Sequence, residues 1–215
     1  MFVSIDGGDG AGKSTQAALL CDWLRAGGRE VVACRDPGST RLGEAIRDLV
    51  LNRHDLQIDR MSEMLLYMAA RAQLAEEVIR PALARGATVV SDRYLLANVV
   101  YQGHGGRLDV DTLWEVGRVA TGGLLPDLCI VLDMPPEKAA ARLNRRLDRM
   151  EQQGEEFHAR VRQGFLDEAA RQPGKIVVVD AAQSIDAVQG EIRSAVGRVL
   201  EEEGEGATGR GRSRN

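Results

Sequence analysis

The sequence predicts an α/β fold in which a five-stranded parallel sheet is flanked by helices. Five short, nearly wholly apolar runs alternate with longer stretches of helical spacing, and a charged residue follows each run directly. Strands buried on both faces have this continuous apolar character, and their alternation with helices gives parallel pairing through right-handed crossovers. The runs cover residues 2–5, 30–34, 88–91, 128–132 and 176–179.

Composition limits the class of protein. The chain has 215 residues, of which 44% are hydrophobic, and a formal net charge of −4. That length suits one domain, and a chain without a basic excess is not expected to bind nucleic acid. No apolar run approaches the roughly 20 residues that span a membrane, and the N-terminus lacks the pattern of a signal peptide. We therefore expect a cytoplasmic protein with no nucleic-acid or membrane partner.

Cysteine and histidine usage agrees with an interior compartment. Cys21, Cys34 and Cys129 are odd in number and far apart, so we expect three reduced thiols. The histidines are also scattered, and the sequence contains no cluster with the spacing of zinc ligands.

The elements follow one another in a regular order. The first strand leads into a glycine-rich loop, and a helix is expected to start near Lys13; helical spacing recurs over residues 61–78. One domain is expected over residues 1–200, with a short lid at 142–154. Residues 201–215 show no apolar periodicity and are predicted to form a disordered tail.

The glycine-rich loop reads GGDGAGKS over residues 7–14 and matches G-x-x-x-x-G-K-[ST] between a strand and a helix. Glycines let the backbone wrap around phosphate oxygens, and the helix N-terminus adds partial positive charge. Lys13 is expected to reach the β- and γ-phosphates of ATP, and the Ser14 hydroxyl to ligate Mg²⁺. The expected ATP-binding residues are Gly7, Gly8, Asp9, Gly10, Ala11, Gly12, Lys13, Ser14 and Thr15.

A nucleotide-binding loop alone leaves the reaction open. A GTPase would carry a guanine-reading N-K-x-D sequence, and none occurs. A large ATPase motor would need a longer chain. The small size and a second group of anion-binding residues favour a kinase that acts on a small molecule.

That second group follows the second and third strands. Asp92 could hold Mg²⁺ through a water, and Arg93 could bind a phosphate through two N–H groups. Arg35 begins the exit of the second strand, where Pro37 and Gly38 set a tight loop. A surface ion pair is the alternative interpretation of Asp92 and Arg93 taken alone.

Together these segments resemble the thymidylate kinases of the bacterial type. The resemblance rests on GGDGAGKST, RDPGST, LLYMAARAQ, DRY with YQG, and LDRME, in this order, and extends over residues 2–200. It implies a P-loop fold of the nucleoside monophosphate kinase kind. The implied reaction is the phosphorylation of dTMP to dTDP by ATP with Mg²⁺. A homodimer is also implied by the resemblance.

The resemblance also implies a dTMP site. Arg93 would bind the dTMP phosphate, and Asp9 would contact the sugar 3′-hydroxyl. Tyr67 and Arg71, spaced i, i+4 on one helix face, would stack on thymine and read its O4 atom. The implied dTMP-binding residues are Asp9, Arg35, Pro37, Tyr67, Arg71, Arg93, Asn98, Tyr101 and Gln102.

Two details of that site depend on local structure. Tyr101 matches the family's aromatic beside the sugar 2′ position, and a helix from Tyr94 would place both rings on one face, toward the strand exit. Ordinary core packing is the alternative for Tyr67 and Tyr101. Asp36 stands where the family usually has Glu.

A cluster of arginines precedes Glu151. A solvated helix face is the ordinary interpretation of such a run. The resemblance instead implies a lid that supplies an arginine to the transferring phosphoryl group; the other type of the family carries that arginine in the P-loop, where this chain has Gly10. The expected catalytic residues are Lys13, Arg93, Arg145, Arg146 and Arg149, and the expected metal ligands are Ser14 and Asp92.

Two other functions share these features. A kinase for a deoxynucleoside or another nucleoside monophosphate would have the same P-loop and Asp-Arg pair. A non-catalytic module that senses nucleotides would bind ATP without phosphoryl transfer. A panel of acceptors separates the three possibilities.

Overall fold

The computed structural model describes residues 1–142 and 147–210, with side chains described through residue 202. Over these residues the chain forms one five-stranded sheet, in the order β2-β3-β1-β4-β5, and every pair of neighbours is parallel. This confirms the predicted sheet. The strands are β1 (Phe2–Gly7), β2 (Val31–Arg35), β3 (Thr88–Asp92), β4 (Leu128–Asp133) and β5 (Ile176–Asp180).

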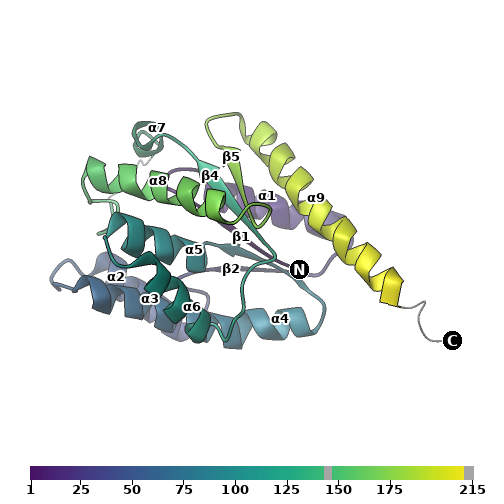
Figure 1. Cartoon of the computed structure of the whole chain (residues 1–215), viewed down its shortest axis with the longest axis horizontal. Helices are drawn as coiled ribbons and strands as arrows, with labels where there is room; N and C mark the ends of the chain where they lie inside the picture. The colour runs from purple at the N-terminus through teal and green to yellow at the C-terminus, as the bar shows by residue number, and fades with distance from the viewer. Residues whose placement is uncertain (143–146, 211–215) are drawn as a thin grey trace.

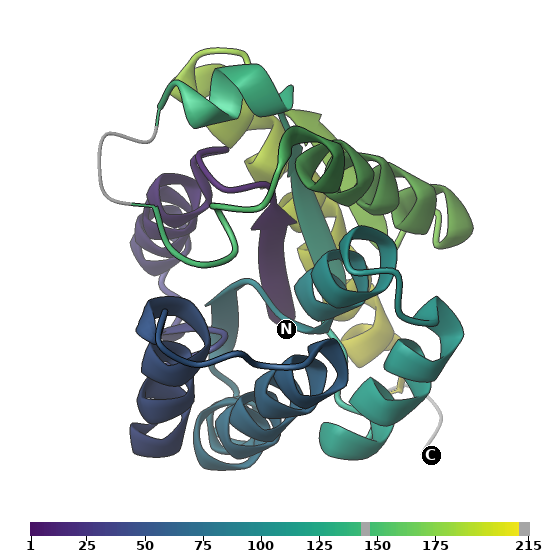
Figure 2. The same ribbon diagram turned by 90° about the vertical axis from the view of Figure 1, so that its left-hand side faces the viewer.

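Helices cover both faces of the sheet. Figure 2 shows β1 at the centre of the molecule with helices around it. On one face α1 (Lys13–Ala26) and α9 (Ile185–Arg210) pack together against the strands (Figure 1). The elements of the other face are α3 (Arg60–Leu74), α4 (Arg80–Ala84), α5 (Leu95–Asn98), α6 (Val110–Ala120), α8 (Glu155–Arg171) and two π-helical stretches, η1 (Ala75–Ile79) and η2 (Val99–Gly105). The remaining helices are α2 (Arg41–Asn52), packed on α3, and the short α7 (Pro136–Ala140).

The alternation of side chains along each strand divides the core between the two faces. Val3 and Ile5 of β1 pack with Leu20 of α1 and Ile192 of α9. Phe2, their neighbour in β1, belongs instead to the larger cluster on the opposite face. Both cores bury strand residues completely, so β1 is covered on both sides. Its carboxyl end is thereby held in a fixed place beneath the P-loop.

The segment after β3 differs from the expected continuous α-helix. α5 passes after one turn into η2. The amide of Gly106, the residue that follows η2, donates to the carbonyl of Tyr101, five residues back, at 2.8 Å. Such wider turns change the phase of the side chains. The prediction that Tyr94 and Tyr101 share a face is therefore wrong. The Tyr94 hydroxyl donates to Leu124 O at 3.2 Å in the core, whereas that of Tyr101 donates to Asp9 Oδ2 at 2.7 Å.

The C-terminal helix is longer than the sequence predicts. α9 runs to Arg210, whereas loss of regular structure was expected after residue 200; residues 211–215 lie outside the described part. Glutamates at 201–203 are good helix formers and allow the helix to continue past its last buried turn. Among the described residues, no helix combines the length and apolar character needed to cross a membrane.

Candidate active site

The P-loop joins β1 to α1 and depends on glycine at two close approaches. Gly7 and Gly10 have φ values of 132° and 82°, in the left-handed region. A Cβ on Gly7 would lie 2.5 Å from the carbonyl oxygen of Leu132, and one on Gly10 would lie 2.2 Å from that of Ala139. No side chain fits at position 10 of this backbone. The P-loop arginine that the other type of the family carries at this position therefore has no room here.

Lys13 begins α1 and lies inside the loop. Its Nζ donates to Gly8 O at 2.7 Å and lies 3.8 Å from Asp9 Oδ1. The residue is only 8% exposed. Burial, together with the positive charge of Arg93, lowers the pKa of Lys13 to about 8. A bound polyphosphate would favour the charged form.

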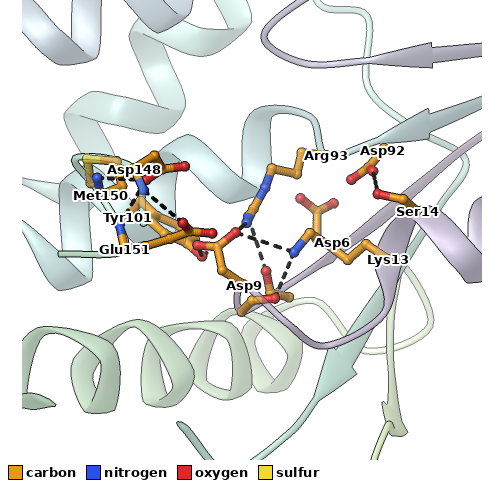
Figure 3. A network of polar contacts seen from close by, with 12 residues as sticks. Asp6, Asp9, Lys13, Ser14, Asp92, Arg93, Tyr101, Asp148, Met150 and Glu151 are labelled. Atoms are coloured by element: carbon orange, nitrogen blue, oxygen red, sulfur yellow. Dashed lines mark hydrogen bonds and ion pairs between the residues drawn. The ribbon is translucent and has the colours of Figure 1, made fainter. Parts of the chain in front are cut away.

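The two predicted metal ligands, Ser14 and Asp92, lie next to each other. The Ser14 hydroxyl, in the first turn of α1, donates to Asp92 Oδ2 at 2.6 Å at the end of β3 (Figure 3). A hydroxyl and a carboxylate side by side are hard oxygen donors, which Mg²⁺ prefers, usually with waters and substrate phosphates as its other ligands. These two residues fit the expected metal.

Arg93 is the centre of a compact polar network (Figure 3). Its guanidinium pairs with the Asp9 carboxylate, donates to Gly7 O at 3.1 Å and donates to the Tyr101 hydroxyl at 3.1 Å. The same guanidinium lies 4.8 Å from the centroid of the Tyr101 ring, within cation–π range. Its backbone φ of 69° turns the chain sharply after β3. The P-loop and the cavity beside it therefore share one positive group.

The acid of this network stays ionised. Burial alone would raise the pKa of Asp9, but the charges of Arg93 and Lys13 and the hydrogen bond from Tyr101 hold it well below its ordinary value. Beneath the loop, Asp6 is fully buried and accepts from Ser4 Oγ at 2.7 Å; desolvation raises its pKa. Asp9, unlike Asp6, faces the cavity.

A cavity next to the P-loop gathers most of the predicted acceptor-site residues. Tyr67 and Arg71 both line it, as their i, i+4 spacing on α3 predicts. The lining residues are Asp9, Asp36, Pro37, Arg47, Leu51, Tyr67, Arg71, Arg93, Ala97, Asn98, Tyr101, Gln102, Asp148 and Met150. Residues from the P-loop, the segment after β2, α2, α3, α5 and η2 thus meet although they are far apart in the sequence.

Arg71 is held in a single orientation. It is 1% exposed, and its Nε donates to Asp36 Oδ2 at 2.5 Å while its Nη1 donates to Asn98 Oδ1 at 2.9 Å. The shorter Asp36 side chain, in place of Glu, therefore still reaches the arginine. The other carboxylate oxygen of Asp36, Oδ1, is buried and has no hydrogen-bond partner in the described part of the chain. Burial raises the pKa of Asp36. A ligand donor could satisfy that oxygen.

Two predicted residues lie elsewhere. Arg35 pairs with Glu44 at 3.1 Å, where both side chains are about half exposed. Arg149 pairs with Glu63 of α3, and its Nε donates to Val50 O at 2.8 Å at the end of α2; its partners are thus not P-loop residues. This position follows from the turn at residues 148–151, which the amino-acid pattern does not specify. Arg145 and Arg146 lie outside the described residues.

Some residues of the site escaped the sequence analysis. Arg47 and Asp148 line the cavity, and Glu63 lies behind it, hydrogen-bonded to Gln102 at 2.8 Å. Glu63 precedes Tyr67 and Arg71 at intervals of four, so helical spacing could have revealed it. Asp148 could not be found this way, because it reaches the cavity through a loop.

The comparisons with known proteins agree with this geometry. A sequence model described as thymidylate kinase matches residues 5–192. The chain belongs to the thymidylate kinase family. The thymidylate kinase of Leifsonia xyli subsp. xyli is 48% identical over 93% of this chain and 96% of its own length. That of Rhodopirellula baltica is 47% identical over 87% of this chain and 76% of its own.

A solved structure extends the likeness to the fold. The crystal structure of thymidylate kinase from Ehrlichia chaffeensis matches with a TM-score of 0.75 at 28% identity, covering 91% of this chain and 98% of that one. The likeness to a thymidylate kinase therefore extends to nearly the whole length of both chains. The resemblance inferred from the motifs is confirmed.

Proposed function

We propose that the P-loop and the adjoining cavity carry out the thymidylate kinase reaction, in which the γ-phosphoryl group of ATP is transferred to dTMP to give dTDP and ADP. Membership of the family supports the reaction. The observation that carries the assignment of sites is the position of Arg93. It contacts the P-loop through Gly7 O and Asp9 and also lines the cavity that holds Tyr67 and Arg71.

On the donor side, the P-loop amides and Lys13 bind the phosphates of ATP. Ser14 and Asp92 would hold Mg²⁺, which when bound neutralises negative charge on the phosphate oxygens. The buried setting of Lys13 strengthens its attraction for a phosphate, because little water competes there.

On the acceptor side, each wall of the cavity meets one part of dTMP. The Tyr67 ring stacks on thymine, and Arg71, which can only donate, reads the O4 acceptor, where cytosine offers a donor. Arg93 binds the phosphate and Asp9 the 3′-hydroxyl. Asn98 and Gln102 face the base edge, and Tyr101 fills the space beside the sugar 2′ carbon.

The chemical step needs no protein nucleophile, because an oxygen of the dTMP phosphate attacks. The chain contributes position and positive charge: Lys13 and Arg93 offset the repulsion between the two phosphates. Arg145 and Arg146 are proposed to bring further positive charge to the transferring group. We further propose that the protein is a cytoplasmic homodimer, on the strength of the family resemblance.

Two substitutions test the assignment of the two sites. Tyr67→Leu should raise the dTMP Kd about tenfold or more, because base stacking contributes roughly 1–3 kcal/mol, and should leave the ATP Kd unchanged. Lys13→Met should lower turnover by about 10²-fold or more and leave the dTMP Kd nearly unchanged. Calorimetry and steady-state kinetics on both variants give these values. A Tyr67→Leu variant that loses ATP and dTMP affinity equally would contradict the separation of sites.

A further inference from the structure

A row of buried polar side chains connects Arg71 and Glu63, two residues of α3, through Asn98 and Gln102. Arg71 Nη1 donates to Asn98 Oδ1 at 2.9 Å, Asn98 Nδ2 donates to Gln102 Oε1 at 2.8 Å, and Gln102 Nε2 donates to Glu63 Oε1 at 2.8 Å. All four residues are at most 7% exposed. Because each member is hydrogen-bonded to the next, the row is continuous.

The direction of this row is set by its two ends. Arg71 carries only donors, and an ionised Glu63 carries only acceptors. Between them the two amides could each point either way, but only one orientation gives every link a donor and an acceptor. Reversing Gln102 would turn its oxygen toward Glu63 and would force Asn98 to present N–H groups to Arg71. Arg71 and Glu63 together therefore fix which edge of Asn98 and of Gln102 faces the cavity.

The second oxygen of Glu63 makes a different contact. It pairs with the guanidinium of Arg149, whose Nε donates to Val50 O at 2.8 Å and whose backbone amide donates to Leu51 O at 3.2 Å. Arg149 is flanked by Asp148 and Met150, which line the cavity. Figure 3 shows these two residues near Tyr101, on the far side of Asp9 from Lys13.

We propose that Glu63 is a positioning residue for the acceptor nucleotide, which orients the Asn98–Gln102 amides with one oxygen and holds the segment at 148–150 against the cavity with the other. The inference rests on the proposed function, since it takes the cavity as the dTMP site. A single carboxylate then couples two walls of that cavity. Glu63 touches no reacting group and acts through Gln102 and Arg149.

Substitution by glutamine separates this role from a purely structural one. Glu63→Gln keeps the shape of the side chain but has only one acceptor oxygen. Gln102 and Arg149 each donate to an oxygen of Glu63, so in the variant one of these two donors faces an N–H group. We expect the dTMP Kd to rise about tenfold or more, the cost of an unsatisfied buried donor, with the ATP Kd unchanged.

The matched control is Glu77→Gln in η1. Glu77 also accepts from a glutamine amide, Gln73 Nε2, at 2.7 Å, but on the exposed surface. This variant should bind both nucleotides as the unaltered protein does.

Coupling is tested by a double-mutant cycle on dTMP binding, measured by calorimetry without ATP. Arg149→Gln alone should weaken dTMP binding, and the effects of Glu63→Gln and Arg149→Gln should be less than multiplicative, because both break the same contact. Multiplicative effects would overturn the coupling.

Three other results would overturn the inference. These are an unchanged dTMP Kd in folded Glu63→Gln protein, equal loss of ATP and dTMP affinity, and, should Glu63→Gln fail to fold, an unchanged dTMP Kd in Arg149→Gln. Failure of the unaltered protein to bind dTMP would instead contradict the proposed function itself, and the inference with it.

Discussion

The ammonium group of Lys13 lies buried between Gly8 O and Asp9, and burial lowers its pKa to about 8. Above that pH the free protein holds a neutral amine. The negative charge of a bound triphosphate raises the pKa again, so the complex keeps the proton. ATP binding should therefore take up a proton at high pH, and affinity should fall as the pH rises through about 8.

Calorimetry in buffers of different ionisation enthalpy measures this uptake. At about pH 8.5 the unaltered protein should take up more protons than Lys13→Arg, whose side chain stays charged. Comparing the two proteins cancels the ionisation of ATP itself. Equal uptake in both would show that Lys13 is already charged in the free protein.

Tyr101 combines a core position with a ligand-facing hydroxyl. Its ring packs 6.2 Å from Phe157 and 6.3 Å from Phe165, between ring centroids, and its hydroxyl donates to Asp9 Oδ2 at 2.7 Å. Tyr101→Ala should lower the thermal midpoint and also open space beside the sugar. The ratio of kcat/KM for the ribose analogue over dTMP should rise, because steric discrimination contributes about 1–3 kcal/mol.

Tyr101→Phe is the control for this prediction. It keeps the ring, so it should keep the preference for deoxyribose although Asp9 loses a donor. Steady-state kinetics with both acceptors on the same preparations measure the ratio. If Tyr101→Ala loses stability but keeps the ratio of the unaltered protein, Tyr101 is a core aromatic only.

At the scale of elements, η2 approaches α8 more closely than a side chain allows. A Cβ on Gly105 would lie 2.7 Å from Phe157 Cε2 and 2.9 Å from Val161 Cγ2. Gly105→Ala should therefore destabilise the fold by about 1–3 kcal/mol through overpacking. Gly190→Ala in α9 meets nothing within 4 Å and should stabilise by up to about 1 kcal/mol.

Urea unfolding of both glycine variants gives the two free energies. The two changes in the free energy of unfolding should have opposite signs, although both substitutions add the same methyl group. A Gly105→Ala variant as stable as the unaltered protein would contradict this close packing, because η2 and α8 would then have to move apart without cost to make room for the added methyl group.

The same element shows where sequence reasoning stops. The P-loop and the stripe of Tyr67 and Arg71 could be predicted, because each depends on spacing within one strand–loop–helix unit or one helix. The π-helical turns of η2 could not, because nothing in local propensity distinguishes them from an α-helix. Tyr101 was therefore wrongly predicted to share a face with Tyr94, although its predicted direction, toward Arg93, is confirmed. The contacts of Arg149 could not be predicted for a related reason: its partners, Glu63 and Val50, are distant in the sequence.

For the whole molecule, the parallel sheet explains why these pieces meet. β1 and β3 are neighbours, with Ile5 opposite Asp92, so the P-loop and the Asp92–Arg93 exit end side by side. β2 pairs with β3 on its other edge, which brings Asp36 within reach of the same place. The parallel sheet could be predicted from the sequence, but its order of strands was not, because strand pairing depends on contacts between segments far apart in the chain.

The most direct test of the central claim measures ADP release from ATP with dTMP, dUMP, dCMP, UMP and thymidine as acceptors, and identifies the product. The account predicts the highest kcat/KM with dTMP, dTDP as the product, and little transfer to thymidine, which lacks the phosphate that Arg93 is proposed to bind. Equal rates with all acceptors, or ADP release that does not depend on an acceptor, would contradict it.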